Sequence, residues 1–392
     1  MIRRELQSVL EEEATRYPVV TVTGPRQSGK TTLCRQTFPD LPWVSLEPLD
    51  VRAFATEDPR GFLGQYADGA ILDEIQHAPG LTSYIQDIVD RDPKPGRFVL
   101  TGSQNLALMS TVSQSLAGRT AVLHLLPPSW IELQRFDRPP EDLLTTLWTG
   151  AFPRIHDRGI PADRWARDYI ATYVQRDVRQ VLAVGELTTF DRFVRLVAGR
   201  TAQERNLSTL AADTGVTSPT ARSWLSVLET GFLVHALPAF HANVRKRLVK
   251  APKLHGVDSG LLCALLGIRT PDELALHPLR GFIFESWVAS ELLKQRLHQG
   301  LTASLSHYRE NRGAEVDVVA DWDDLLLVET KSGQTYRSEF AKGVTRLAER
   351  LRGSQGHRRV RPVVVFGGDE GQRRSDVEVL SWREIGELGA GA

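Results

Sequence analysis

Residues 24–31 of this chain are Gly24-Pro25-Arg26-Gln27-Ser28-Gly29-Lys30-Thr31, which match the pattern G-x-x-x-x-G-K-[ST] at every fixed position. An apolar run, Val19–Thr23, precedes them, and a helical pattern, Thr31–Phe38, follows. Glycines allow the backbone to turn its N–H groups inward toward an anion, and the helix adds the positive end of its dipole. The pattern therefore predicts a phosphate-binding loop between a buried strand and a helix.

The residue types in this loop predict ATP with Mg²⁺ as the ligand. We expect the backbone of residues 24–31, together with Thr32, to surround the phosphates. The Lys30 ammonium is expected to reach the β- and γ-phosphates, and the Thr31 hydroxyl to bind Mg²⁺. A chance glycine-rich turn is the alternative, and the flanking strand and helix disfavour it.

A second apolar strand, Ala70–Leu72, ends in the two acids Asp73 and Glu74. In P-loop enzymes an acid at such a strand end helps to hold Mg²⁺. We therefore expect Asp73 to bind the metal and Glu74 to orient the attacking water. The alternative interpretation is that Asp73 and Glu74 are two solvated acids at a surface strand end. The complete P-loop elsewhere in the sequence disfavours that interpretation.

Two further positions are candidates for contact with the phosphates. The strand Phe98–Thr101 runs into Gly102 and three polar residues, and the carboxyl end of a strand is where an open α/β sheet binds ligand. One of Ser103, Gln104 or Asn105 could sense the γ-phosphate, although an ordinary polar loop explains them equally well. Arg119 is a candidate for neutralising transition-state charge, with a solvated arginine as the alternative.

The first third of the chain alternates short apolar runs with helical stretches. Several runs are continuously apolar, which is typical of parallel strands buried on both faces, and this predicts an α/β fold. The predicted strands are Val19–Thr23, Trp43–Leu46, Ala70–Leu72, Phe98–Leu100 and Ala121–Leu125.

Composition narrows the function classes. The 48 basic and 48 acidic residues give zero net charge, which argues against a nucleic-acid binder held by bulk charge. The two cysteines, Cys34 and Cys263, lack metal-type spacing and favour a reducing compartment. The N-terminus lacks the apolar core of a signal peptide, and no apolar run approaches the ~20 residues that span a bilayer. We expect a cytoplasmic protein without membrane segments.

The loop Gly24–Thr31, the strand end Leu72–Glu74 and the strand Leu100–Ser103 resemble the AAA-type P-loop ATPases of prokaryotes. Within these, the resemblance is to the group whose ATPase is followed by the domain of unknown function DUF4143. The resemblance continues in Ser115–Arg119, in Leu126–Trp130 with Glu132, and in Gly150–Arg154. It implies a Walker A, Walker B and sensor arrangement, with Lys30, Thr31, Asp73 and Glu74 in those roles. It also favours a phosphate-contacting role for Arg119. AAA-type enzymes often form rings that supply an arginine in trans, so an oligomer is possible.

The middle of the chain predicts a helix-turn-helix. Leu207–Val216 has the pattern of a short helix and a turn, and a second helix follows over Thr220–Glu229, with Ser218 as N-cap and Pro219 at its start. The basic stretch of Arg245, Lys246, Arg247, Lys250 and Lys253 could form a wing that contacts phosphates. A helical bundle that serves as scaffold is the alternative, since Arg222 is the one strong base reader in the second helix.

The last part of the chain holds a possible nuclease-like site. Glu285 lies on the helix Phe282–Leu297, Asp317 lies in an alternating run, and Glu329 and Lys331 fall on one face of the next strand. Two acids that bind metal and one lysine suit Mg²⁺-dependent phosphodiester cleavage. This arrangement resembles the PD-(D/E)xK nuclease fold, with Glu285, Asp317 and Glu329 as metal ligands and Lys331 as the catalytic lysine. A fold relic that serves as an interaction module is the alternative.

We therefore predict three domains: an AAA-type ATPase over residues 1–148, a helical, winged-helix-like region over 149–255, and an α/β restriction-endonuclease-like domain over 256–392. Two functions remain open. In the first, ATP turnover is coupled to binding or processing of DNA or RNA. In the second, ATP drives a conformational switch whose C-terminal domain binds a protein partner and cuts nothing.

Overall fold

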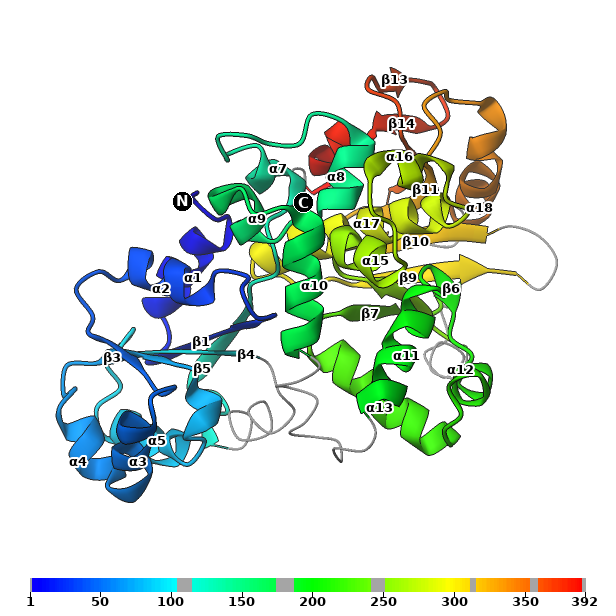
Figure 1. The fold of residues 1–392 in the computed structure, drawn as a ribbon. Coiled ribbons are helices and arrows are strands. Elements are labelled where there is room, and N and C mark those ends of the chain that lie inside the picture. Colours follow the sequence, from blue (N-terminus) through cyan, green and yellow to red (C-terminus); the bar gives the residue numbers. More distant parts are fainter. Residues whose placement is uncertain are drawn as a thin grey trace. The chain divides into compact units, whose positions relative to one another are not determined.

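The structure, a computed structural model, describes residues 2–103, 115–173, 187–240, 251–310, 315–352 and 359–389. The chain divides into two compact units (Figure 1). Unit 1 consists of Met1–Pro128, Thr230–Phe232 and Leu297–Leu301, and unit 2 of Ser129–Glu229, Leu233–Arg296 and Thr302–Ala392. The predicted sensor candidates Gln104 and Asn105 and the basic residues 245–247 and 250 lie outside the described residues. The three predicted domain ranges stay predictions.

Unit 1 contains a five-stranded parallel sheet, which confirms the α/β prediction. The strand order is β2-β3-β4-β1-β5 (Figure 1). The strands are β1 (Val19–Gly24), β2 (Trp43–Ser45), β3 (Ala70–Asp73), β4 (Phe98–Ser103) and β5 (Thr120–His124). The helices are α1 (Leu6–Ala14), α2 (Lys30–Thr37), α3 (Leu49–Glu57), α4 (Pro59–Gly64) and α5 (Leu81–Arg91), with a 3₁₀ turn at Ile75–His77.

The three inner strands of this sheet, β1, β3 and β4, are buried on both faces, as their continuous apolar runs predict, whereas the edge strands β2 and β5 are partly exposed. Along β1, Val20 and Val22 belong to one core cluster, together with Leu6 and Leu10 of α1. Val19 belongs to a second cluster, which α3, α4 and α5 supply with apolar side chains. Because the strands are parallel, their carboxyl ends meet at one edge, where β1 leads into residues 24–31 and β3 ends at Asp73.

The first part of unit 2 is mainly helical, as predicted. Its helices are α7 (Trp130–Leu133), α8 (Leu143–Thr149), α9 (Pro153–Arg158), α10 (Ala162–Tyr173), α11 (Leu187–Ala198), α12 (Leu207–Thr214), α13 (Ser218–Thr230), α15 (Ser259–Leu265), α16 (Pro271–Leu276) and α17 (Arg280–His298). A small antiparallel sheet in the order β6-β8-β7 joins them, with β6 (Gln203–Glu204), β7 (Val234–Leu237) and β8 (Lys253–Gly256).

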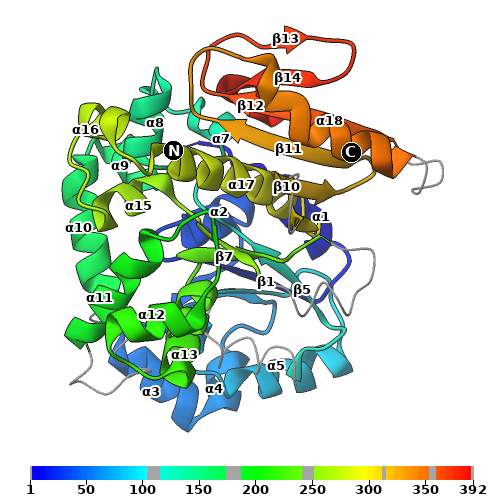
Figure 2. The same cartoon turned by 90° about the vertical axis from the view of Figure 1, so that its right-hand side faces the viewer.

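A six-stranded mixed sheet ends unit 2, in the order β13-β14-β12-β11-β10-β9. Its strands are β9 (Leu305–Arg309), β10 (Glu315–Asp321), β11 (Leu325–Lys331), β12 (Val360–Phe366), β13 (Gln372–Arg373) and β14 (Glu378–Ser381). Figure 2 shows α18 (Lys342–Arg352) lying along this sheet, where Val344 and Leu347 pack against the core residues Leu327 and Val364. Strands β10 and β11 correspond to the two strands expected to carry Asp317 and Glu329, whereas β13 and β14 were not predicted. Among the described residues, no helix has the length and apolar composition needed to cross a membrane.

Candidate nucleotide-binding site

The loop between β1 and α2 depends on backbone conformations that its glycines allow. Gly24 has φ +150° and Gly29 has φ +100°, both in the region that side chains disfavour. A Cβ atom on Gly24 would lie 2.1 Å from the carbonyl oxygen of Leu125. Gly29 is the N-cap residue of α2 and has no side chain to cap it, so the first N–H groups of this helix remain for an anion.

Lys30 is folded back onto the loop that precedes it. Its ammonium donates hydrogen bonds to the carbonyl oxygens of Gly24 at 3.1 Å and Pro25 at 2.8 Å. Burial lowers the pKa of Lys30 to about 8, although Glu74 and Asp73 nearby act in the opposite direction. The ammonium is therefore buried against the loop, where a charge-assisted hydrogen bond to a bound phosphate group would be strong.

Side chains of two elements, α2 and β4, contact the Asp73 carboxylate at the end of β3. The Thr31 hydroxyl, in the first turn of α2, donates to Asp73 Oδ1 at 2.9 Å. The Thr101 hydroxyl of β4 donates to the same oxygen, and Asp73 itself is buried. A hydroxyl beside a carboxylate offers the hard oxygen ligands that Mg²⁺ prefers. The buried Ser28 hydroxyl has no hydrogen-bond partner among the described residues, which also suits a loop that awaits a polar ligand.

Glu74 follows in a left-handed conformation, with φ 59° and ψ 46°. This conformation turns the chain out of β3 immediately after Asp73. The Glu74 carboxylate is half-buried and accepts a hydrogen bond from the Gln76 side-chain amide. The backbone of Ser103 pairs with Gly24 across β4 and β1, but the structure does not describe its side chain. Whether this segment senses the γ-phosphate stays a prediction.

Arg119 does not lie with these residues. It directly precedes β5, where its carbonyl oxygen accepts from the Val19 N–H at the amino-terminal edge of the sheet. Its guanidinium forms an ion pair with Asp90 of α5, with Nη2 2.9 Å from Oδ2. The P-loop follows the opposite end of β1, so the geometry does not support contact between Arg119 and a phosphate in its own loop. A contribution in trans stays a prediction.

Arg4, which no sequence motif indicates, contacts the P-loop. Its guanidinium is buried and donates to the carbonyl oxygens of Ser28 at 2.9 Å and Leu126 at 2.8 Å. No spacing in the sequence distinguishes Arg4 from the exposed Arg3 beside it. Thr101 was recognised as part of a strand, but its contact with Asp73 was not foreseen.

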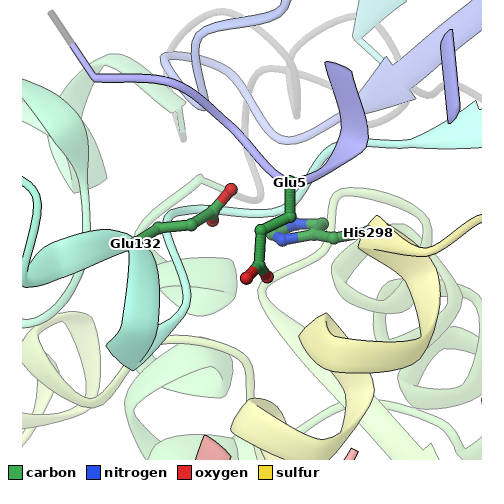
Figure 3. Close-up of side chains that lie close together, drawn as sticks. All are labelled: Glu5, Glu132 and His298. Atoms are coloured by element: carbon green, nitrogen blue, oxygen red, sulfur yellow. The ribbon is translucent and has the colours of Figure 1, made fainter. Parts of the chain in front are cut away.

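Figure 3 shows two further titratable side chains of unit 1, Glu5 and His298, whose potential ligand atoms lie within 4.8 Å of one another. The Leu126 N–H donates to His298 Nε2 at 3.2 Å, so this ring nitrogen acts as an acceptor. Glu132, labelled in the same view, belongs to unit 2, where it accepts from the Ser129 N–H at 2.9 Å and completes the capping box of α7. His298 and Glu132 therefore each satisfy a backbone donor.

The residues of the possible nuclease-like site lie around a lysine that was not assigned to it. Lys253 Nζ lies 3.0 Å from Glu285 Oε1, 2.8 Å from Glu315 Oε1 and 3.7 Å from Asp317 Oδ1. The other oxygen of Asp317 accepts from the N–H and the hydroxyl of Thr330, both at 2.8 Å. Glu329 forms an ion pair with Lys331.

The electrostatics of this acidic cluster follow from its burial. Burial raises the pKa of Glu285 well above its usual range, and Asp317 adds to this shift. The pKa of Glu329 is raised to about 7 for the same two reasons. Burial alone would lower the pKa of Lys253, but Glu285 and Asp317 outweigh it, so the pKa is raised. Lys253 therefore stays charged near neutral pH.

The prediction that Lys253 contacts phosphates from a wing is wrong. Its side chain is only 3% exposed and faces the carboxylates of unit 2. The metal-binding role expected of Glu285, Asp317 and Glu329 stays a prediction. Within the described part of the chain, no grouping of three metal-ligand atoms within 4.8 Å of one another contains Glu285, Asp317 or Glu329.

The fold and the loop geometry of unit 1 define a P-loop ATPase domain. Residues 16–134 match the family described as an AAA domain, residues 140–272 match a domain of unknown function (DUF8612), and residues 280–385 match another (DUF4143). The chain belongs to the AAA-type ATPases that carry a C-terminal DUF4143 domain.

The chain is similar to two curated proteins in sequence and to several solved structures. An uncharacterized protein of Mycobacterium tuberculosis and one of Mycobacterium bovis are each 32% identical to this chain over 329 residues, covering 81% of this chain and 71% of each relative. A Walker-type ATPase of Pyrococcus abyssi is similar in structure, with a TM-score of 0.45, 16% identity and coverage of 67% of this chain and 94% of that one. A RuvB variant of Thermotoga maritima has a TM-score of 0.30, 20% identity and coverage of 60% and 88%.

Proposed function

We propose that this chain binds Mg·ATP in the P-loop and hydrolyses it. The observation that carries the proposal is the contact between Thr31 and Asp73, which joins the loop to the acid of the neighbouring strand. Lys30 is placed to pair with the phosphates, and Glu74 to orient the attacking water. Thr31 and Asp73 would hold Mg²⁺, and the ion would neutralise charge on the phosphate oxygens.

Phosphate release tests this proposal when the parent chain is compared with Glu74→Gln. The variant keeps its shape and the metal-binding acid, so we expect it to bind ATP but to turn it over at least about 100-fold more slowly, since general-base contributions are typically ~10²–10⁴-fold. Glu57→Gln, an exposed change at the end of α3, is the matched control. Equal turnover in the parent chain and Glu74→Gln would contradict the role given to Glu74.

A second candidate function is nucleic-acid binding through a winged-helix-like module. Helices α12 and α13 are joined by a turn at Gly215, with φ +81°, and the antiparallel pair β7 and β8 follows. Arg222 is exposed on α13, the position of a recognition helix. These features support contact with a phosphate backbone or a base edge.

Binding of duplex DNA and of RNA at several salt concentrations tests this candidate. The slope of log affinity against log salt is negative, and for duplex DNA the loss of one phosphate contact decreases its magnitude by ~0.9. We expect this decrease in Arg222→Ala, and no change in Arg346→Ala, which removes an exposed arginine of α18. The absence of salt-dependent binding in the parent chain would exclude this candidate.

The alternative is an ATP-driven switch whose C-terminal domain binds a protein partner and cuts nothing. The ion pairs of Lys253 favour it, because they engage the acids that cleavage would need. Nucleotide shifts such a switch only if it binds one conformation better than the other. Limited proteolysis should then give different cleavage patterns with ATP, with ADP and without nucleotide. One common pattern would reject the switch.

A further inference from the structure

The acidic cluster of unit 2 surrounds a buried cation that the chain itself supplies. Lys253 comes from β8, Glu285 from α17, and Glu315 and Asp317 from β10. All three carboxylates lie within 3.7 Å of the single ammonium group. Lys253 therefore joins the small β6-β8-β7 sheet to a long helix and to the C-terminal sheet.

At least one carboxylate oxygen of each predicted metal ligand is engaged by another group. Asp317 Oδ2 accepts two hydrogen bonds from Thr330, and Asp317 Oδ1 faces Lys253. Glu285 Oε1 accepts from Lys253 at 3.0 Å, and Glu329 pairs with Lys331. A divalent ion bound to Asp317 or Glu285 would also lie next to a buried positive charge, which repels it strongly where water is excluded.

We propose that the Lys253 ammonium is the built-in cation of this cluster and takes the place of a divalent metal ion. The cluster then holds β8, α17 and β10 together and does not cleave phosphodiesters. The proposal does not depend on ATP hydrolysis, because every residue in it belongs to unit 2.

Binding of Mn²⁺ to the full-length chain without nucleotide tests this proposal, with free Mn²⁺ measured by electron paramagnetic resonance. The parent chain and Asp317→Asn should bind the same number of ions. Lys253→Met removes the ammonium and nearly keeps the volume, so it should bind one additional Mn²⁺ per chain. That ion should be lost again when Asp317→Asn is added to Lys253→Met.

Lys294→Met is the matched control, because Lys294 is also buried in an ion pair, 2.7 Å from Glu291 Oε1. It should gain no Mn²⁺. A parent chain that binds Mn²⁺ in a manner abolished by Asp317→Asn would overturn the proposal, and so would a folded Lys253→Met variant that gains none. If Lys253→Met does not fold, Mn²⁺-dependent cleavage of DNA and RNA decides. If the parent chain cleaves the nucleic acid and the Asp317→Asn variant does not, the proposal is overturned. If the parent chain and the variant give the same result, the proposal is supported.

Discussion

Arg4 and Ser28 are joined by a buried hydrogen bond of 2.9 Å, in which the Arg4 guanidinium donates to the carbonyl oxygen of the loop residue. The same guanidinium donates to Leu126, which follows β5. One side chain thus connects the N-terminal segment, the P-loop and the segment after the last strand of the sheet. Because a loop that is already ordered loses less entropy on binding, this connection should favour the nucleotide-bound state.

Arg4→Ala should weaken ATP binding about tenfold or more, since each buried carbonyl oxygen that loses its donor costs ~1–3 kcal/mol. Arg3→Ala removes a neighbouring exposed arginine and should leave the affinity unchanged. Calorimetric titration measures both affinities, and thermal melting of the same samples shows whether the variants are folded. A folded Arg4→Ala variant with the parent affinity would contradict the connecting role.

The affinity for ATP should fall as the pH rises above about 8. Burial lowers the pKa of Lys30 to about 8 in the nucleotide-free chain, and pairing with phosphates requires its charged form. Bound phosphate raises this pKa, so binding takes up a proton above pH 8 and weakens by up to about tenfold per pH unit. Titrations between pH 7 and pH 9.5 measure this dependence. A constant affinity over that range would show that Lys30 does not titrate there.

Thr101→Val should raise the Mg²⁺ concentration that gives half-maximal phosphate release. The change keeps the shape of the side chain but removes a hydrogen bond that orients Asp73. Groups that hold metal ligands in place typically contribute ~10–100-fold to metal affinity. Thr21→Val is the control, because it also removes a buried hydroxyl, one that pairs with Thr120 at 2.9 Å. Equal Mg²⁺ dependence in Thr101→Val and the parent chain would refute this role.

The sequence predicts the P-loop fold well because the determinants are local. Gly24 and Gly29 specify the backbone of the loop, and the continuous apolar runs specify strands buried on both faces. Short strands such as β13, with two residues, carry too little periodicity to be recognised.

The sequence predicts the surroundings of individual charges less well, because their partners lie far along the chain. The buried Arg4 guanidinium donates a hydrogen bond to the carbonyl oxygen of Leu126, which lies 122 residues further along the chain. No local sequence pattern encodes that contact. Lys253 follows a basic stretch and was grouped with it, whereas its carboxylate partners come from α17 and β10. Arg119 belongs to a recognisable motif, but the direction of β5 places it at the sheet edge away from the loop.

Calorimetric titration of Mg·ATP into the parent chain and into Lys30→Ala tests the nucleotide site most directly. We expect the parent chain to bind one ATP per chain, and Lys30→Ala to bind at least about tenfold more weakly, since loss of one charge-assisted contact costs ~1.5–3 kcal/mol. A parent chain that gives no binding heat at any temperature tested, or a Lys30→Ala variant with the parent affinity, would contradict the assignment of residues 24–31 as the phosphate-binding loop.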